Sequence, residues 1–342
     1  MTELLAVRDL SVSFATDDGV VRAVRDVSFD VGPGEVLGVV GESGCGKSVT
    51  AAALMGLLPR TATVTGSIRF RGRELVGLPS RELRTLRGAG IAMIFQDPMS
   101  ALNPVHTVGA QLAEAYRAHH DVSRRDARDR AVDALELVGI PQPRRRADQF
   151  PHEYSGGMRQ RAVIAMAVIN DPPLLVADEP TTALDVTVQA QILETLQAIR
   201  ERTGAAIMMI THDLGVVAGL AGRVQVMYGG TVVESGSVDE VFTAPRMPYT
   251  LGLLGAVPHP ELVGRPLTPV PGAPPSLLRL ARGCTFTPRC PLAAPVCREA
   301  EPDLVETDRP GHPTRCHRWP VVAGLARPQE LFARLVDAGG DG

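Results

Sequence analysis

A glycine-rich segment near the start of the chain restricts its fold more than any other feature. It reads Gly41-Glu42-Ser43-Gly44-Cys45-Gly46-Lys47-Ser48 and matches the pattern G-x-x-x-x-G-K-[ST] in full. The apolar run Val36–Val40 precedes it, and a helical segment follows from Lys47 until Pro59. Its glycines let backbone N–H groups converge on phosphate oxygens, and the helix N-terminus adds partial positive charge. The sequence therefore predicts a phosphate-binding loop, the P-loop, between a strand and a helix.

Lys47 is the only lysine of the chain, although Lys and Arg together number 35. This position therefore requires a compact ammonium group rather than a guanidinium. We expect Lys47 to reach the β- and γ-phosphates of ATP and the Ser48 hydroxyl to ligate Mg²⁺. The predicted ATP-binding residues run from Gly41 through Ser48 to Val49. The motif does not require the side chain of Cys45, which we expect to be a small filler exposed to oxidation.

A second motif supplies two carboxylates. The apolar run Leu174–Ala177 ends in Asp178 and Glu179, which places both at the carboxyl edge of a buried strand. Asp178 is expected to hold Mg²⁺, commonly through water, and Glu179 to orient or deprotonate the attacking water. Carboxylates after a strand often only solvate a loop, but two adjacent ones in a chain with a P-loop favour hydrolysis.

A third motif, Ser155-Gly156-Gly157, opens a helix that we expect to run from about Met158 to Ile169. A helix N-terminus opened by glycines is, physically, a second anion site. Because one P-loop already encloses its own phosphates, the simplest use of the spare site is to cap ATP that another subunit holds. Taken alone, the motif also fits a plain helix cap.

Strands and helices alternate through most of the chain. Alternating apolar and polar residues predict antiparallel strands at the start, and buried strands, helices and a hairpin over Val224–Val233 follow. This order predicts an α/β fold with a largely parallel, doubly wound sheet over residues 1–244, an N-terminal antiparallel β lobe and a helical insertion at about 97–160. From about Pro245 periodicity is lost, so residues 245–342 are expected to form a small separate C-terminal element.

Charge and composition exclude some classes of function. The formal net charge is −3 and aromatic residues make up 4%, so neither a broad basic surface nor a base-stacking platform for nucleic acid is expected. No apolar run approaches the roughly 20 residues of a membrane span, and the first residues lack a secretory signal pattern. We therefore expect a cytoplasmic protein with reduced thiols that serves a membrane only through partners.

In this order, these segments resemble the ATP-binding subunit of ABC transporters over roughly residues 4–241. Beyond the P-loop and the carboxylate pair, the resemblance rests on Gln96, Tyr154-Ser155-Gly156-Gly157-Met158, Thr182-Ala183-Leu184-Asp185 and His212. The family's usual signature is Leu-Ser-Gly-Gly-Gln, and the variants Tyr154 and Met158 resemble the peptide and nickel importer branch. The resemblance implies that residues 1–244 form a P-loop NTPase core of the ABC ATPase type.

The resemblance also implies roles for single residues. Phe14 would stack on the adenine, Gln96 would touch Mg²⁺ and the attacking water, and His212 would hydrogen-bond the γ-phosphate. The signature residues would contact ATP held by a second ABC ATPase subunit, and Asp185 would support contacts across that dimer. The implied catalytic residues are Glu179, His212, Gln96 and Lys47, and the implied Mg²⁺ ligands are Ser48, Gln96 and Asp178.

A finer resemblance points to the dipeptide and oligopeptide importers. It rests on the segment Phe95–Pro104 and on the tail segments Pro248-Tyr249-Thr250 and Gly283–Pro291. It implies ATP hydrolysis that energises peptide import, at the cytoplasmic face of the membrane. The implied partners are a second ATPase subunit in a homo- or heterodimer, two integral-membrane permeases and, indirectly, an extracytoplasmic peptide-binding protein. Nickel import, and a soluble ABC ATPase outside transport, are the alternatives.

Four of the five cysteines lie in the C-terminal element, namely Cys284, Cys290, Cys297 and Cys316. Disulfides are not expected in a reducing compartment, so four thiolates in a segment with little core suggest a metal staple. The spacing lacks the C-x-x-C pairs of zinc ribbons, and the resemblance to peptide-importer ATPases favours a [4Fe–4S] cluster over Zn²⁺. His312 and His317 could substitute as ligands, and free structural thiols are the alternative.

Overall fold

The computed structural model describes residues 3–97, 101–182, 185–256, 270–280, 282–326 and 331–332. The chain divides into two compact units. The helical unit comprises Met1–Leu5, Asp30–Val36 and Phe70–Ile210, and the P-loop unit comprises Ala6–Phe29, Leu37–Arg69 and Thr211–Gly342.

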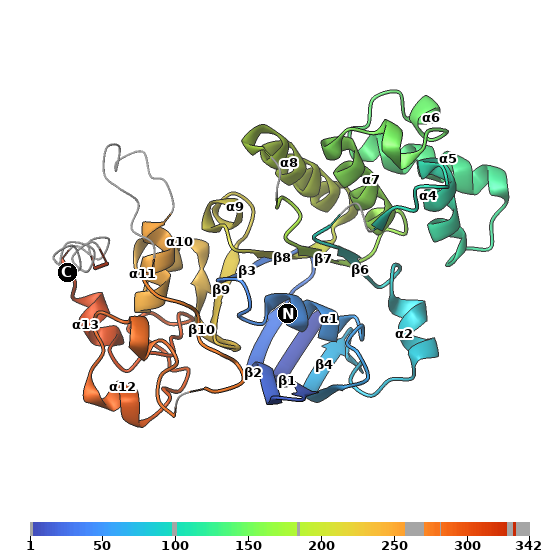
Figure 1. The fold of residues 1–342 in the computed structure, drawn as a ribbon. Helices are drawn as coiled ribbons and strands as arrows, with labels where there is room; N and C mark the ends of the chain where they lie inside the picture. The colour runs from blue at the N-terminus through green and yellow to red at the C-terminus, as the bar shows by residue number, and fades with distance from the viewer. Residues whose placement is uncertain are drawn as a thin grey trace. The chain divides into compact units, whose positions relative to one another are not determined.

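The helical unit combines short parallel strands with most of the long helices (Figure 1). Its strands are β5 (Arg73–Glu74), β6 (Ile91–Ile94), β7 (Leu174–Asp178) and β8 (Ala206–Thr211), the last ending just beyond the unit. Its helices are α2 (Ser80–Leu86), α4 (Val108–Arg117), α5 (Arg124–Leu137), α6 (Pro143–Arg146), the 3-10 turn η1 (Pro151–Glu153), α7 (Gly156–Val168) and α8 (Val186–Thr203).

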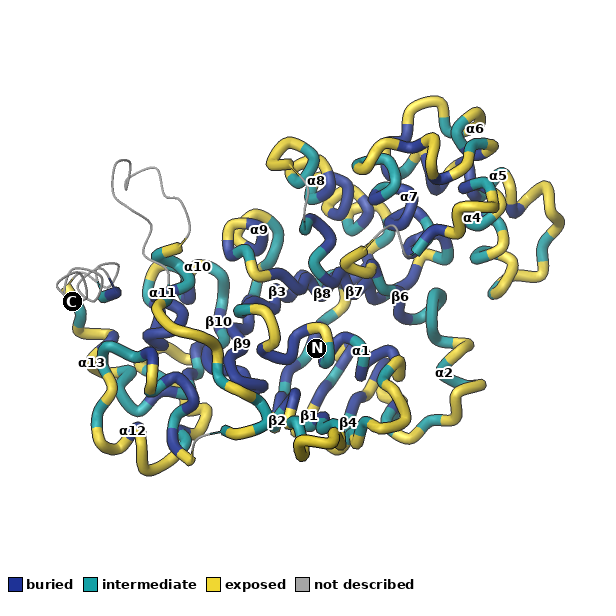
Figure 2. The backbone as a smooth tube through the Cα atoms, in the orientation of Figure 1, coloured by how far each residue is buried: buried dark blue, intermediate teal, exposed yellow. Residues whose placement is uncertain are grey.

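Strand β7 pairs in parallel with β6 on one side and with β8 on the other. All five residues of β7 and all six of β8 are buried, which is visible as dark tube in Figure 2. Runs that are apolar throughout, rather than alternating, are typical of strands covered on both faces. Because the strands are parallel, their carboxyl ends share one edge, and Asp178 ends β7 there.

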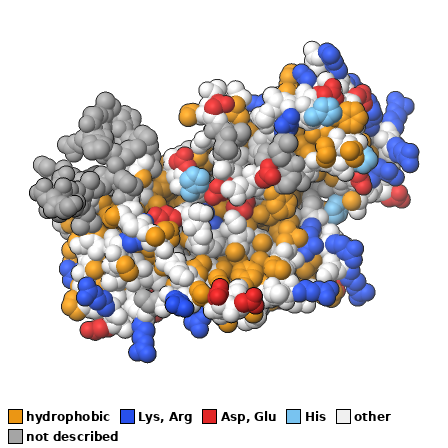
Figure 3. All heavy atoms as spheres, in the orientation of Figure 1, with side chains coloured by type: hydrophobic (Ala, Val, Ile, Leu, Met, Phe, Trp, Pro, Cys, Tyr) orange, Lys and Arg blue, Asp and Glu red, His pale blue; other side chains and the backbone are white. Residues whose placement is uncertain are grey.

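Helices α4, α5 and α7 pack against one another and form the helical insertion (Figure 1). Side chains cap each N-terminus, since Thr107, Ser123 and Ser155 accept hydrogen bonds from backbone N–H groups three residues later. Figure 3 shows basic side chains over the region of α5 and α6 with acidic ones among them. Ion pairs join them, such as Arg128–Asp148 at 2.7 Å, so this is a mixed charged surface.

The P-loop unit holds the N-terminal strands, the P-loop and the C-terminal element. Its strands are β1 (Leu5–Thr16), β2 (Gly19–Val31), β3 (Val36–Val40), β4 (Ala62–Phe70), β9 (Arg223–Tyr228) and β10 (Thr231–Ser237), a few end residues excepted. Its helices are α1 (Lys47–Leu54), α9 (Leu214–Ala218), α10 (Val238–Thr243), α11 (Pro248–Gly255), η3 (Thr287–Arg289), α12 (Pro295–Glu299) and α13 (Trp319–Ala323).

Two sets of strands build this unit. Strands β2, β1 and β4 are neighbours in that order. Strand β3 pairs in parallel with β9, which turns back antiparallel into β10. The turn consists of Gly229 and Gly230 with φ of 55° and 85°, a two-residue hairpin that glycine makes without strain. The carboxyl end of β3 leads directly into the P-loop.

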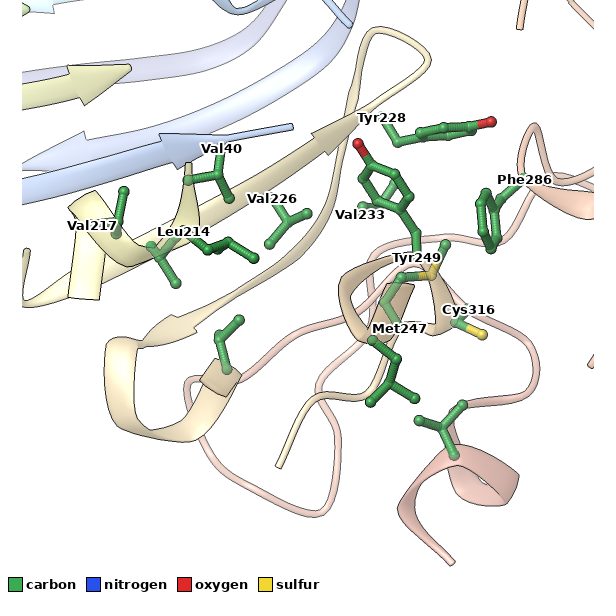
Figure 4. Close-up of a cluster of buried hydrophobic side chains, with 14 of the residues drawn as sticks. Val40, Leu214, Val217, Val226, Tyr228, Val233, Met247, Tyr249, Phe286 and Cys316 are labelled. Atoms are coloured by element: carbon green, nitrogen blue, oxygen red, sulfur yellow. The ribbon is translucent and has the colours of Figure 1, made fainter. Parts of the chain in front are cut away.

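An aromatic cluster joins the C-terminal element to β9 and β10. The rings of Tyr228, Tyr249 and Phe286 lie with their centroids 4.5–5.4 Å apart and face one another in Figure 4. Beside them, the backbone N–H of Arg315 donates to the Val233 carbonyl at 2.7 Å. The C-terminal element therefore shares one apolar core with β3, β9 and β10, which its irregular sequence did not predict.

The strands β3 and β7 and the hairpin of β9 and β10 lie where the sequence predicted them. The short helices α2, α9, α10 and α11 were not predicted, although Ser237 and Glu240 form a capping box whose spacing is readable in the sequence. Among the described residues, no helix combines the length and apolar character needed to cross a bilayer.

Candidate functional site

The P-loop backbone takes conformations that only glycine adopts easily. Gly41, Gly44 and Gly46 have φ of 153°, 79° and 106°. A Cβ atom at Gly41 would lie 2.2 Å from the Met227 carbonyl oxygen, and one at Gly46 would lie 2.5 Å from the Ala23 carbonyl oxygen. The glycines therefore let the loop lie against β9 and β2 while its N–H groups stay available to an anion. This cradle fits the phosphates of a nucleotide.

Lys47 is the first residue of α1, and only 4% of it is exposed. Its Nζ donates to the carbonyl oxygens of Gly41 at 2.6 Å and Glu42 at 3.0 Å. The ammonium therefore lies inside the curve of the loop, where a triphosphate would meet it. The chain's only lysine is held by these two backbone carbonyls and by the Cys45 sulfur at 3.8 Å, so its charge is directed at the cradle.

The position of Cys45 differs from the prediction. It was expected to be exposed to oxidation, but the residue is buried, with its Sγ 3.8 Å from Lys47 Nζ. Burial raises the pKa of the Cys45 thiol, an effect that the nearby Lys47 charge partly opposes. A neutral, enclosed thiol is a poor nucleophile, so Cys45 acts as packing beneath the loop.

Glu42 has contacts that sequence reasoning missed. Its backbone N–H donates to the Tyr249 hydroxyl at 2.8 Å, and its carboxylate accepts two hydrogen bonds from Arg289 at 2.6 and 2.8 Å. Both partners belong to the C-terminal element and lie 207 and 247 residues further along the chain. No local pattern connects such distant positions, so the sequence near Glu42 does not predict these contacts.

Three other predicted residues also lie in the P-loop unit. Ser48 is exposed on the first turn of α1, and Phe14 is half-buried on β1. His212 is exposed and directly follows β8. Their assigned roles toward Mg²⁺, adenine and γ-phosphate stay predictions.

The helical unit brings Gln96 and Glu179 together. Gln96 Nε2 donates to Glu179 Oε2 at 3.2 Å, and the Thr182 hydroxyl donates to the same oxygen at 2.7 Å. Glu179 has a φ of 48°, which is unusual for a residue with a side chain, and its N–H donates to the Ile210 carbonyl. Asp178, beside it, is 5% exposed at the end of β7. A residue with a strained backbone whose carboxylate accepts two hydrogen bonds is typical of a functional site.

The signature segment lines a cavity of about 520 Å³ in the helical unit. Ser155 caps α7 by accepting from Met158 N–H at 3.3 Å, and Asp185 caps α8 by accepting from Val188 N–H at 2.9 Å. The cavity lining includes Ser155, Gly156, Gly157, Met158, Arg161 and Asp185. Two helix N-termini therefore open near one hollow, where their N–H groups and dipoles attract an anion.

The four cysteines of the C-terminal element are the expected ligands of the [4Fe–4S] cluster. Burial, with a smaller contribution from the neighbouring cysteines, raises the pKa of Cys290 and of Cys316 to about 12. Within the described residues, however, no group of three or more His, Cys, Asp or Glu side chains is arranged to hold a metal ion. The four thiols as placed here therefore do not form the expected metal site.

The two histidines proposed as substitute ligands have other contacts. His312 Nε2 lies 2.8 Å from Glu234 Oε1, and both side chains are completely buried. The half-buried His317 has its Nε2 3.0 Å from the Ala300 carbonyl oxygen. The His312–Glu234 pair fixes the C-terminal element to β10, which is a structural role.

Comparison with known proteins identifies the family of the chain. Residues 24–182 match the ABC transporter family, and residues 233–297 match the family described as the C-terminal region of oligopeptide/dipeptide transporters. The oligopeptide transport ATP-binding protein OppD of Salmonella typhimurium is 52% identical over 92% of this chain and 93% of the relative. The dipeptide transport ATP-binding protein DppD of Bacillus subtilis is 54% identical over 88% and 91%. The chain belongs to this family of peptide-transporter ATP-binding proteins.

The chain is also similar to a longer protein and to two solved structures. An OppD of Mycobacterium bovis is 56% identical over 95% of this chain, but the chain spans only 53% of that relative's length. A dimeric post-hydrolysis structure of the ATP-binding cassette MJ0796, bound to ADP and Pi, has a TM-score of 0.62 at 25% identity and covers 68% of this chain. CbiO1 of Clostridium perfringens has a TM-score of 0.61 at 26% identity. The expected family and ABC ATPase fold are thus confirmed.

Proposed function

We propose that this chain binds and hydrolyses ATP and, as one subunit of an ABC importer, energises the uptake of dipeptides or oligopeptides. The observation that carries the proposal is the complete P-loop with its one lysine buried inside the curve of the loop. The family of transport ATP-binding proteins to which the chain belongs supports the peptide cargo. ATP and Mg²⁺ are the substrate and the cofactor of such a site.

The hydrolytic step would use the carboxylate held by Gln96 and Thr182. Glu179 takes a proton from the water that attacks the γ-phosphorus, and the bond to the β-phosphate oxygen breaks to leave ADP and phosphate. Lys47 and the loop N–H groups stabilise the charge that gathers on the phosphate oxygens. Mg²⁺, held by Ser48, Gln96 and Asp178, would neutralise the β- and γ-phosphates.

The second anion site supports a dimer. The N–H groups at the start of α7 face a cavity in the helical unit, whereas the P-loop of the same chain already has its own cradle. Two ATPase subunits would therefore close head-to-tail, with each ATP between one P-loop and the other chain's Ser155-Gly156-Gly157 segment. Asp185 would steady that contact, and hydrolysis would let the pair reopen.

The remaining partners follow from the transport role. Two integral-membrane permeases would receive the movement of the dimer, and an extracytoplasmic peptide-binding protein would deliver the cargo. The chain would then lie at the cytoplasmic face of the membrane. Residues 1–244 would act as the ATPase domain and 245–342 as a separate functional element, with the [4Fe–4S] cluster as a further proposal.

That cluster is supported only by the gathering of Cys284, Cys290, Cys297 and Cys316 in one element. A rearrangement of the thiols, with loss of their protons, would be needed before they could bind iron. Iron and sulfide analysis of protein purified without oxygen tests it, and stoichiometric zinc in a colourless protein would contradict it.

The ATPase proposal is tested by Glu179→Gln in the full chain. We expect ATP binding to persist while turnover falls by about 100-fold or more, because the general base is lost. ATP should then hold the variant as a dimer in gel filtration. Glu194→Gln, an exposed change of the same chemistry on α8, is the matched control and should hydrolyse ATP normally. Full turnover by Glu179→Gln would show that another residue activates the water.

A further inference from the structure

The C-terminal element reaches the P-loop through one arginine. Arg289 is the last residue of η3, and its side chain is 5% exposed. It forms a two-pronged ion pair with Glu42, the second residue of the P-loop, whose side chain is 24% exposed. A bidentate pair that is largely removed from water is strong and fixes the direction of both groups.

All five N–H donors of the Arg289 guanidinium have partners. Two bonds go to Glu42, and the others go to the carbonyl oxygens of Pro271 at 2.7 Å and Val270 at 3.1 Å and to the Tyr228 hydroxyl at 3.3 Å. The guanidinium also lies 5.8 Å from the centre of the Tyr228 ring. A lysine has three donors and no planar fork, so it could not reproduce this arrangement.

Glu42 is in turn held at each of its polar groups. Arg289 binds its carboxylate, Tyr249 accepts from its N–H, and its carbonyl accepts from Lys47 Nζ. The tyrosine remains a neutral hydroxyl because burial raises its pKa. The residue that touches the phosphate-binding lysine is therefore positioned by two side chains of the C-terminal element.

We propose that Arg289 is a positioning residue for nucleotide binding, acting through Glu42 on the P-loop. Without Arg289, the Glu42 carboxylate would be an unpaired negative charge in a loop that must receive a triphosphate. It would repel the phosphates and compete with them for the Lys47 ammonium. Arg289 neutralises this carboxylate and turns it away, so the C-terminal element sets the affinity of the loop for ATP. This inference rests on the proposed ATP-binding function.

The test compares Arg289→Met with the double variant Arg289→Met/Glu42→Gln in the full chain. Binding of a fluorescent ATP analogue with Mg²⁺ should weaken about tenfold or more in the single variant, since a charged hydrogen-bonded pair is broken. The double variant should regain much of this loss because the repelling carboxylate is gone. In steady-state kinetics the KM for ATP should rise in Arg289→Met, with a smaller change in kcat.

Controls separate positioning from simple folding. Asp308→Asn breaks the Arg246–Asp308 pair, another ion pair of the C-terminal element, and should leave nucleotide affinity unchanged. If Arg289→Met does not fold, Arg289→Lys keeps the charge without the fork and should bind with intermediate affinity.

The possible results are distinct. Normal binding by the folded Arg289 variants, or a double variant as weak as the single one, would overturn the positioning role while leaving the ATPase proposal intact. Failure of the unmodified chain to bind nucleotide would overturn the proposed function itself, and the inference with it.

Discussion

Among the described residues, two helix N-termini are opened by glycine, and they are built differently. Helix α1 follows Gly46, which has a left-handed φ of 106° and provides no side-chain cap. Helix α7 follows the extended Ser155, whose hydroxyl caps the helix by accepting from Met158 N–H. Both ends expose backbone donors and a positive dipole, so the physics of anion attraction is shared.

Their surroundings differ more than their backbones do. At α1 the buried Lys47 supplies a cation, and Tyr249 and Arg289 hold the loop from the same unit. At α7 Ser155 and Gly156 are exposed beside a cavity, and the Arg161 of its lining donates to the Val138 and Gly139 carbonyls. One site has a buried cation directed at it, whereas at the other, here called the open site, the guanidinium is bound to backbone carbonyls. An open site of this kind suits a phosphate that arrives on another molecule.

The largest effect is expected from a negative charge placed at the open site, which tests whether a phosphate of another molecule binds there. Gly156→Asp should fold normally, because a Cβ atom there meets nothing within 4 Å and an acidic residue suits a helix N-terminus. Its carboxylate should repel a phosphate from a second chain and reduce ATP-dependent dimerisation about 100-fold, since like charges in contact cost several kcal/mol. Binding of ATP by the single chain should not change. Sedimentation and nucleotide titration measure the two quantities separately.

Two further variants complete that test. Gly156→Asn has nearly the same shape without the charge and should dimerise more strongly than Gly156→Asp. Lys47→Met should show the opposite pattern, with weaker nucleotide binding by the single chain. Equal dimerisation of the Asp and Asn variants would mean that no phosphate approaches α7.

Two alanine substitutions compare how strongly the backbone requires glycine at the start of α1 and at the start of α7. Gly46→Ala should lower the free energy of unfolding by about 2 kcal/mol or more, because a left-handed backbone and a Cβ atom 2.5 Å from the Ala23 carbonyl oxygen both oppose it. Gly156→Ala should leave it unchanged or raise it by roughly 0.5 kcal/mol. Urea denaturation measures both. Similar losses in the two variants would contradict the view that only the first glycine is demanded by the backbone.

The sequence predicted the motifs that form these two sites better than it predicted the contacts that hold them in place. The P-loop, the run Leu174–Glu179 and the capped start of α7 are local patterns, in which neighbouring residues determine one another's conformation, and each formed where expected. The positive φ of Glu179 was not predicted, because a carboxylate carries no signal for a left-handed backbone. The exposure expected of Cys45 was wrong, since the loop folds that side chain inward beneath Lys47.

Contacts between distant segments could not be predicted in this way. Arg289 and Glu42 are 247 residues apart, and the motif around each of them gives no sign of the other. The cysteine spacing suggested a staple, yet the C-terminal element is held by the aromatic cluster, by backbone bonds to β10 and by the buried His312–Glu234 pair. Aromatic residues scattered through an irregular segment have no period, so their common core became visible only in three dimensions.

The smallest effect concerns a tyrosine beside the open site. The buried Tyr154 hydroxyl donates to the Arg146 carbonyl at 2.9 Å and ties the start of α7 to α6, much as Tyr249 supports the P-loop. Tyr154→Phe should cost about 1 kcal/mol of unfolding free energy near pH 8, which is the usual value of one hydrogen bond.

This cost should disappear as the solution becomes alkaline. Burial, opposed by Arg146, raises the pKa of Tyr154 from 10 to about 12. Between these values the unfolded chain loses the phenolic proton before the folded chain does, so the unfolding free energy of the natural protein falls as pH rises, by about 1.4 kcal/mol per pH unit. The phenylalanine variant lacks this term, and the other tyrosines are common to both proteins. Urea denaturation at pH 8 and pH 11 should therefore show the two stabilities converging or crossing, and a constant difference would mean that the hydroxyl beside the open site is not held by burial.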